Sequence, residues 1–174
     1  MEVIIISIIT KKEALELIKN SSKFQHLLRV SKLMKKLANY LHEDENEWEL
    51  VGLLHDFDYD ITFTNPGLHG VVGAEMLSDK LSHSALNAIK AHDYRSIYEP
   101  EDLVAKILIS ADAFDIYLSL MVKNNIPLTK NNLITNLENW HFEKPWLKEL
   151  IENCKMNNIP LEKFIEFGLA ALMD

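Results

Sequence analysis

The stretch GLLHDFDYD at residues 52–60 puts a histidine and three aspartates directly behind what looks like an apolar helix end. Burying such groups without partners is costly, roughly 2 to 7 kcal/mol for a neutral polar group and more for a charge. Something must therefore compensate them. A metal ion is one candidate, because imidazole nitrogens and carboxylate oxygens are common metal ligands.

Further polar side chains fall on apolar helical faces elsewhere in the sequence. At helical spacing, His26 shares a face with Val30 and Leu33, and His92 shares one with Ile89. His55 lines up with Val51 and Trp48, and Asp112 has only apolar helical neighbours. Any one such histidine is more often a core residue satisfied by a backbone carbonyl. As a set they favour convergence on a nitrogen–oxygen site for divalent Fe, Mn, Zn or a related metal.

The composition indicates one globular domain over residues 1–174, since 48% hydrophobic content is enough for one good core. The net charge of -8 argues against extended contact with nucleic acid, which is bound largely through Lys and Arg. Cys154 is the single cysteine, which excludes an intrachain disulfide and is consistent with a cytoplasmic location. Residues 1–10 are expected to be an N-terminal extension, too short to span a membrane. The sequence is compatible with a monomer or a homo-oligomer.

Apolar residues recur mostly at spacings of three and four, which predicts an all-α fold, a compact bundle of helices around the metal site. Thr10 and Glu13 form a capping-box pattern, and Ser22, Asp44 and Ser82 are expected to begin later helices. Residues 57–68 are expected to be a loop. The predicted helices cover about residues 10–20, 22–42, 44–55, 69–78, 82–92, 101–123, 130–139, 144–155 and 161–173.

The order His26, then His55-Asp56, then Asp112 resembles the H…HD…D pattern of the HD superfamily of metal-dependent phosphohydrolases. The local sequence is similar to bacterial HDIG-type predicted hydrolases. The matching segments are HLLRV at 26–30, GLLHDFDYD at 52–60, HGVVGAE at 69–75 and AIKAH at 88–92. The resemblance covers about residues 11–115 well and the final helix moderately. It leaves residues 116–158 without a motif, within a helical C-terminal part at 116–174.

The resemblance implies a first divalent metal held by His26, His55, Asp56 and Asp112. Asp56 could bridge to a second metal held by His69 and His92, so the resemblance implies one or two divalent ions, Mn, Fe, Mg or similar. It further implies that metal-activated water cleaves a phosphomonoester or phosphoanhydride of a nucleotide-like or small phosphorylated metabolite. Dinucleoside polyphosphates are one variant of this substrate class. A di-iron oxygenase and a non-catalytic, metal-stabilised binding module are the alternatives.

Many relatives read H-D-x-G-K, whereas Asp58 and Tyr59 occupy the Gly and Lys positions here. Asp58 is therefore a candidate catalytic residue that orients a histidine ligand or accepts a proton, with a loop cap as the equally weighted alternative. The two arginines, Arg29 and Arg95, are candidate phosphate-binding residues or else surface ion pairs. The aromatic residues Trp140, Phe142 and Trp146 are expected to pack a helical hairpin, or alternatively to form a lid or stacking surface.

Overall fold

The computed structural model describes residues 9–93 and 95–173, and this part of the chain consists of helices and connecting loops without a strand. The all-α prediction is confirmed. The N-terminal extension expected at 1–10 lies outside the described residues except for its last two. The helices are α1 (Lys11–Ile18), α2 (Phe24–Leu41), α3 (Glu45–Leu54), α4 (Tyr59–Thr62), the 3₁₀ turn η1 (Pro66–Leu68), α5 (Val71–Met76), α6 (His83–Ala91), α7 (Leu103–Lys123), α8 (Lys130–Trp140), α9 (Pro145–Met156) and α10 (Leu161–Met173).

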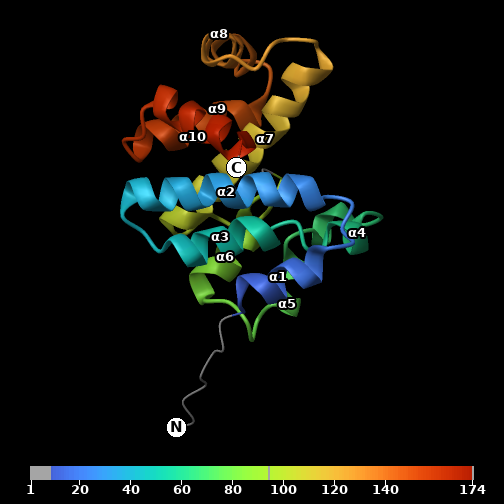
Figure 1. Ribbon diagram of the computed structural model, residues 1–174. Helices are drawn as coiled ribbons and strands as arrows, with labels where there is room; N and C mark the ends of the chain where they lie inside the picture. The colour runs from blue at the N-terminus through green and yellow to red at the C-terminus, as the bar shows by residue number, and fades with distance from the viewer. Residues whose placement is uncertain (1–8, 94, 174) are drawn as a thin grey trace.

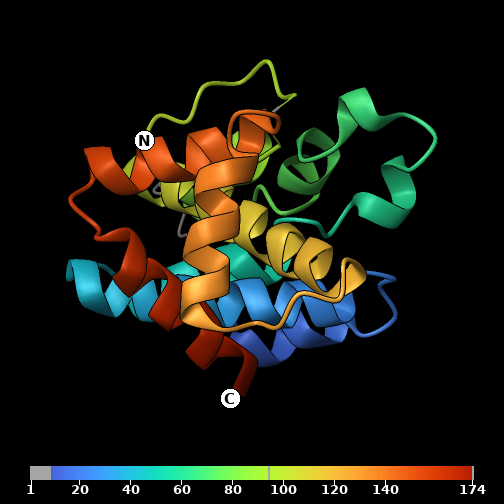
Figure 2. The same ribbon diagram turned by 90° about the horizontal axis from the view of Figure 1, so that it is seen from above.

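Helix α2 runs across the middle of the molecule, with α1, α3, α5 and α6 on one side and α8, α9 and α10 on the other (Figure 1). Seen from above, α8 lies in front of the other helices near the middle of the molecule, and the segment from α4 to α5 projects at one edge (Figure 2). Helix α2 contacts α3, α7 and α10, and α7 also packs against α6 and α9. Helices α2 and α7 therefore connect the two halves of the bundle.

Three of the predicted helix starts are confirmed by hydrogen bonds. Thr10 and Glu13 form the capping box, with the Thr10 amide donating to Glu13 Oε2 at 2.8 Å. Asp44 Oδ1 accepts from the amides at the start of α3, and Ser82 Oγ accepts from the Ala85 amide at 3.1 Å. These side chains satisfy amides that the first helical turn leaves without partners.

The expected start at Ser22 is wrong. Helix α2 begins at Phe24 with Lys23 in the N-cap position, and among the described residues Lys23 makes no side-chain cap hydrogen bond. The Ser22 amide and hydroxyl instead donate to the Asp60 carboxylate, with the amide at 2.9 Å. Ser22 was expected to cap a helix, but its donor groups bind Asp60, a residue distant in the sequence.

The expected loop at residues 57–68 is also partly wrong, because it contains α4 and η1. Helix α4 is a single turn in which the Thr62 hydroxyl donates to the Asp58 carbonyl at 2.9 Å. Pro66 occupies the first turn of η1, where its fixed φ suits the conformation. Elements of one turn have no repeating apolar stripe, so hydrophobic periodicity does not reveal them.

Two glycines permit the close backbone contacts that place the ends of α3 and α6. A Cβ at Gly52 would lie 2.7 Å from the Ser31 Cα, so only glycine lets α3 approach α2 this closely. Gly70 has a φ of 75°, and a Cβ there would lie 2.5 Å from the Ile89 carbonyl oxygen. The Gly52 carbonyl and the Ile89 carbonyl, which Gly70 approaches, each hold a histidine, as described below.

The core lies between the helices, with Phe114, Tyr117 and Phe164 among its largest fully buried side chains. Tyr117 donates its hydroxyl to the Leu133 carbonyl at 2.7 Å, which satisfies this polar group inside the core. In the described residues no helix combines the length and apolar character needed to cross a membrane.

Candidate metal centre

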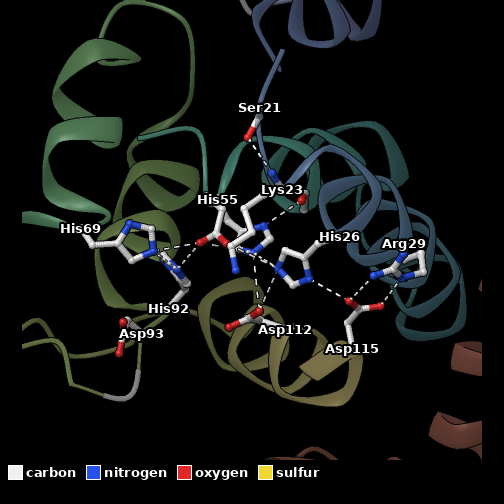
Figure 3. A network of polar contacts seen from close by, with 12 residues as sticks. Ser21, Lys23, His26, Arg29, His55, His69, His92, Asp93, Asp112 and Asp115 are labelled. Carbon is white, nitrogen blue, oxygen red and sulfur yellow. Dashed lines mark hydrogen bonds and ion pairs between the residues drawn. The ribbon is translucent and has the colours of Figure 1, made fainter. Parts of the chain in front are cut away.

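Six side chains that are separated in the sequence converge between α2, α3, α6 and α7 (Figure 3). His26 comes from the first turn of α2, His55 and Asp56 follow α3, His69 follows η1, His92 caps α6, and Asp112 lies within α7. These are the six metal ligands that the resemblance implied. The structure brings all of them together, and five of the six are almost entirely buried, with Asp112 the most exposed at 16% of its side chain.

One half of the centre is formed by His26, His55 and Asp112. The Nε2 atoms of His26 and His55 are 3.1 Å apart. Asp112 Oδ1 lies 3.1 Å from His26 Nε2 and 3.7 Å from His55 Nε2. Three ligand atoms of these types this close together match the donor set of a divalent transition metal.

The other half is formed by His69, His92 and Asp56. The Nε2 atoms of His69 and His92 are 3.2 Å apart. Asp56 Oδ1 lies 2.9 Å from His69 Nε2 and 3.2 Å from His92 Nε2. The second oxygen of Asp56 lies 3.5 Å from His26 Nε2. The Asp56 carboxylate therefore stands between the two halves, as a bridging ligand would.

The outward nitrogens of His55 and His92 are held by backbone carbonyls. His55 Nδ1 donates to the Gly52 carbonyl at 2.8 Å, and His92 Nδ1 donates to the Ile89 carbonyl at 2.6 Å. An ordinary core histidine would also have a backbone partner. In His55 and His92 the carbonyl binds only Nδ1, so Nε2 of both residues points into the centre.

The outward nitrogens of His26 and His69 are held by carboxylates. His26 Nδ1 lies 2.8 Å from Asp115 Oδ2, and His69 Nδ1 lies 2.9 Å from Asp58 Oδ1. Asp58 is fully buried, and its other oxygen accepts from the Gly73 amide at 2.9 Å. Carboxylates that accept from the outer nitrogen of a histidine ligand orient the ring and set its tautomer.

These outer partners decide how well the centre fits a metal. In the tautomer that carries its proton on Nδ1, each neutral ring turns an Nε2 lone pair toward another at 3.1 or 3.2 Å. Two such lone pairs repel each other unless a proton or a metal ion lies between them. Because the donors are imidazole and carboxylate groups, the residues present fit divalent metal ions.

The electrostatics of the metal-free centre favour protons in those positions. Burial by itself would lower the pKa of His26, but the Asp112 and Asp115 carboxylates outweigh it and raise this pKa to about 10. The same balance, with Asp56 and Asp58 as acceptors, raises the pKa of His69 to about 10. Burial would raise the pKa of Asp56, yet the neighbouring histidines hold it well below its usual range.

Both arginines take part in ion pairs. Arg29 donates from Nε to Asp115 Oδ1 at 2.6 Å and from Nη2 to Asp115 Oδ2 at 2.9 Å. Arg95 donates from Nε to Asp93 Oδ1 at 2.9 Å. Of the two roles expected for Arg29 and Arg95, the ion pair is therefore confirmed for both residues. Phosphate binding by either arginine stays a prediction. The Arg29 guanidinium therefore points at Asp115, which in turn contacts His26.

Sequence reasoning missed Asp115 and Lys23. Asp115 is three residues after Asp112 in the same apolar helix, and this second inward carboxylate was the available signal. Lys23 places its Nζ 4.1 Å from the centroid of the Tyr59 ring, which in turn contacts the His69 ring. No local motif points to Lys23. A lysine side chain thus lies over Tyr59, whose ring contacts one of the six converging residues.

Cavities surround Arg95 at the edge of the centre. One of about 340 Å³ is lined by His69 together with apolar residues such as Leu68 and Ile97. A second, of about 280 Å³, is lined by His92, Asp112 and Trp146, and a third, of about 140 Å³, by Tyr59 and His69. Arg95 lines all three. The centre is therefore accessible from spaces of small-molecule size.

Comparison with known proteins places these residues in a family. The chain is 36% identical over 91 residues to ribonuclease Y of Clostridium botulinum, in the Hall, Langeland and Loch Maree strains among others. The match covers 51% of this chain but 17% of those longer proteins. No solved structure matches the chain significantly. The HD domain model matches residues 24–117, which contain all six converging residues. The chain therefore belongs to the HD domain family, whose domains bind divalent metals and whose membership supports a hydrolase.

Proposed function

We propose that the protein is a metal-dependent phosphohydrolase that cleaves a phosphomonoester or phosphoanhydride of a nucleotide-like or other small phosphorylated metabolite. The observation that carries the proposal is the pair of facing Nε2 atoms on each side of the Asp56 carboxylate, 3.1 and 3.2 Å apart. This arrangement supports two neighbouring positions for divalent ions. Paired ions of this kind are a recurring device for in-line displacement at phosphorus.

The roles of the residues follow from their contacts. His26, His55 and Asp112 would hold one ion, His69 and His92 would hold a second, and Asp56 would be a ligand of both. Divalent ions bound there supply Lewis-acid chemistry, polarising a phosphoryl oxygen and activating water near neutral pH. The lowered pKa of Asp56 keeps this carboxylate ionised as a ligand. Asp58 contacts His69 and the Gly73 amide. These contacts support the role in which Asp58 orients the His69 ring, rather than the alternative in which it caps its own loop.

Several observations support a small substrate. The cavities beside the centre, about 340 and 280 Å³, are near the lower end of the range for small-molecule sites. The net charge of -8 offers little to the backbone of a long nucleic acid. Arg95, which lines both cavities, is a phosphate-binding candidate at the entrance.

RNA is the second candidate substrate, because the curated relatives are named ribonuclease Y. A phosphodiester could occupy the same centre as a phosphomonoester. The chain spans about a sixth of the length of those relatives, so RNA cleavage by this chain is a proposal. A substrate panel that includes a short single-stranded RNA separates the two candidates.

The decisive experiment begins with protein purified without a histidine tag or chelators. Elemental mass spectrometry would measure metal content in the wild type, in Asp56→Ala and in the control Asp79→Ala, whose side chain is 74% exposed. We expect about two ions per chain in the wild type and control, and a sharp loss in Asp56→Ala. Phosphate release from nucleotides and simple phosphate esters would then be measured with Mn, Fe and Mg.

Each result has a definite meaning. Metal-dependent phosphate release, absent in Asp56→Ala, supports the proposal, whereas RNA cleavage without release from small esters favours the second candidate. Oxygen consumption by the iron form without phosphate release points to the di-iron oxygenase. Metal that raises the melting temperature while no substrate is turned over identifies a binding module. If the wild type neither retains nor takes up metal, the ligand assignment is wrong.

A further inference from the structure

The cavity of about 280 Å³ joins the metal centre to a residue outside the part of the chain that matches the HD domain. Its polar wall contains His92, Asp112 and the Arg95–Asp93 ion pair, and Trp146 contributes to its lining from α9. The HD match ends at residue 117, whereas Trp146 belongs to the segment for which the sequence offered no motif. The cavity is therefore lined both by two of the six converging residues, His92 and Asp112, and by a tryptophan from the C-terminal part of the chain.

The remaining wall is one apolar face of α7. Ile109 and Ile116 lie three positions before and four positions after Asp112, so the three side chains share a helical face. Both isoleucines line the cavity, and Ile116 is 44% exposed although it is a large apolar residue. A ligand that contacts Asp112 in this cavity thus has apolar surface beside it.

Trp146 is held firmly at this position. It lies in the first turn of α9 directly after Pro145, whose ring fixes the backbone at the helix start. Helix α9 packs against α7, and the Trp146 side chain is partly buried against the core. An indole anchored in this way loses little conformational freedom when a ligand stacks on it.

The other two tryptophans have structural positions. Trp48 is 2% exposed inside the core, and the Trp140 ring packs edge-on against the Tyr117 ring with centroids 5.8 Å apart. The packing role expected for the aromatic group thus fits Trp140. Trp146 differs, since it lines a cavity that also contains two residues of the metal centre.

Resting on the phosphohydrolase function proposed above, we propose that Trp146 determines specificity by stacking on a planar aromatic ring in the group attached to the phosphate. The phosphate would lie against His92 and Asp112 with Arg95 beside it, and the ring would lie between Trp146 and the apolar face of α7. The substrate class is therefore an aromatic phosphate ester or anhydride, a nucleoside phosphate or an aryl phosphate. An alkyl phosphate would leave the indole unused.

The test compares Trp146→Leu, which keeps apolar volume but removes the stacking surface, with Trp146→Phe, which keeps a ring. Phe142→Ala is the control, because Phe142 is a neighbouring aromatic residue that is 82% exposed. The kcat and KM of the manganese-loaded proteins would be measured for a nucleoside monophosphate and for glycerol phosphate. Metal content and melting temperature would show that the variants fold.

We expect Trp146→Leu to raise the KM for the nucleoside monophosphate about tenfold, as removal of base stacking typically does, while the kcat changes little. The KM for glycerol phosphate should stay the same in all variants, and Trp146→Phe should restore most of the affinity for the nucleoside monophosphate. An equal rise for both substrates in a folded, metal-loaded variant overturns the proposal. An unchanged KM in Trp146→Leu does so too.

A binding measurement separates this proposal from the proposed hydrolase function. Calorimetry would follow a nucleoside without phosphate as it binds to the full metal-free chain. Weaker binding to Trp146→Leu than to the wild type supports the aromatic subsite, even when no phosphate is released from any ester. If the nucleoside fails to bind the wild type, or binds both proteins equally, the aromatic subsite is wrong while phosphate release still decides the hydrolase function.

Discussion

Asp115 accepts a hydrogen bond from the outer nitrogen of His26 at 2.8 Å, and Arg29 binds both oxygens of the same carboxylate. This relationship joins α2 to α7 beside the metal centre. Asp115 is 4% exposed, and its pKa is held below the usual range, because His26 and Arg29 outweigh the opposing effect of burial. The carboxylate is thus ionised and fixed, as a group that orients a metal ligand must be.

We expect Asp115→Ala to weaken metal binding about 10- to 100-fold, the usual cost of removing such an outer partner. Asp115→Asn should lose less, since its amide oxygen can still accept from His26 Nδ1. Titration calorimetry with Mn²⁺ would measure the affinities, with Asp79→Asn as an exposed control. Metal affinity that is unchanged in a folded Asp115→Ala protein would contradict this role.

Metal binding should release protons at neutral pH. The pKa values of His26 and His69 are raised to about 10 in the metal-free protein, so both rings are protonated at pH 7 and must lose a proton to coordinate. Metal affinity should therefore rise with pH. Calorimetry in buffers with different ionisation enthalpies would measure the protons released, and equal heats in all buffers would refute the prediction.

The stability of the metal-free protein should show the opposite dependence on pH. A folded-state pKa above the unfolded value of about 6.5 stabilises the fold at low pH, and this contribution is lost as pH rises toward the folded pKa of about 10. Chelated protein should thus lose stability between these values. Metal-loaded protein should not show this loss, because bound ions replace the protons. Urea unfolding at several pH values would compare the two forms.

The close approach of α2 and α3 offers a test of how the fold positions His55. Gly52→Ala would place a Cβ 2.7 Å from the Ser31 Cα, and relieving this overlap should cost about 1 to 3 kcal/mol of unfolding free energy and reduce metal content. Gly67→Ala is the matched control, since the nearest atom would be 3.8 Å away. Equal stability of the two variants in urea unfolding would show that the helices separate freely.

Glu49 provides a test away from the metal centre. It is buried on α3 and forms ion pairs with Lys11 at 2.6 Å and Lys35 at 3.0 Å, which together outweigh burial and lower its pKa. Glu49→Gln should destabilise the protein by about 1 to 2 kcal/mol at pH 7. Glu16→Gln, in an exposed pair with Lys19, should have little effect.

The effect of Glu49→Gln should depend on pH. Because the pKa of Glu49 is lowered in the folded state, its contribution is present above the unfolded value of 4.5 and is lost as pH falls through the folded pKa. The difference in unfolding free energy between wild type and variant should shrink accordingly in acid. A difference that stays constant down to pH 3 would show that the charge of Glu49 is unimportant.

Much of the fold and of the ligand set could be read from the sequence, because both depend on local patterns. The start of α8 at Lys130 and the span of α10 from Leu161 to Met173 agree with their predicted bounds. The inward faces of His26, His55 and His92 follow from helical spacing alone, since residues three and four apart lie on one side of a helix. The motif order then associated them with Asp56 and Asp112.

Only the tertiary structure decided which residues distant in the sequence contact one another. Ser22 contacts Asp60 and caps no helix, and His26 meets a carboxylate 89 positions away. Trp146, from beyond the family match, lines a cavity beside the centre. Periodicity and capping patterns depend on residues within a few turns, so they specify which face of a helix points inward. Which atoms meet across that face depends on how α2, α7 and α9 pack, and only the folded chain determines this.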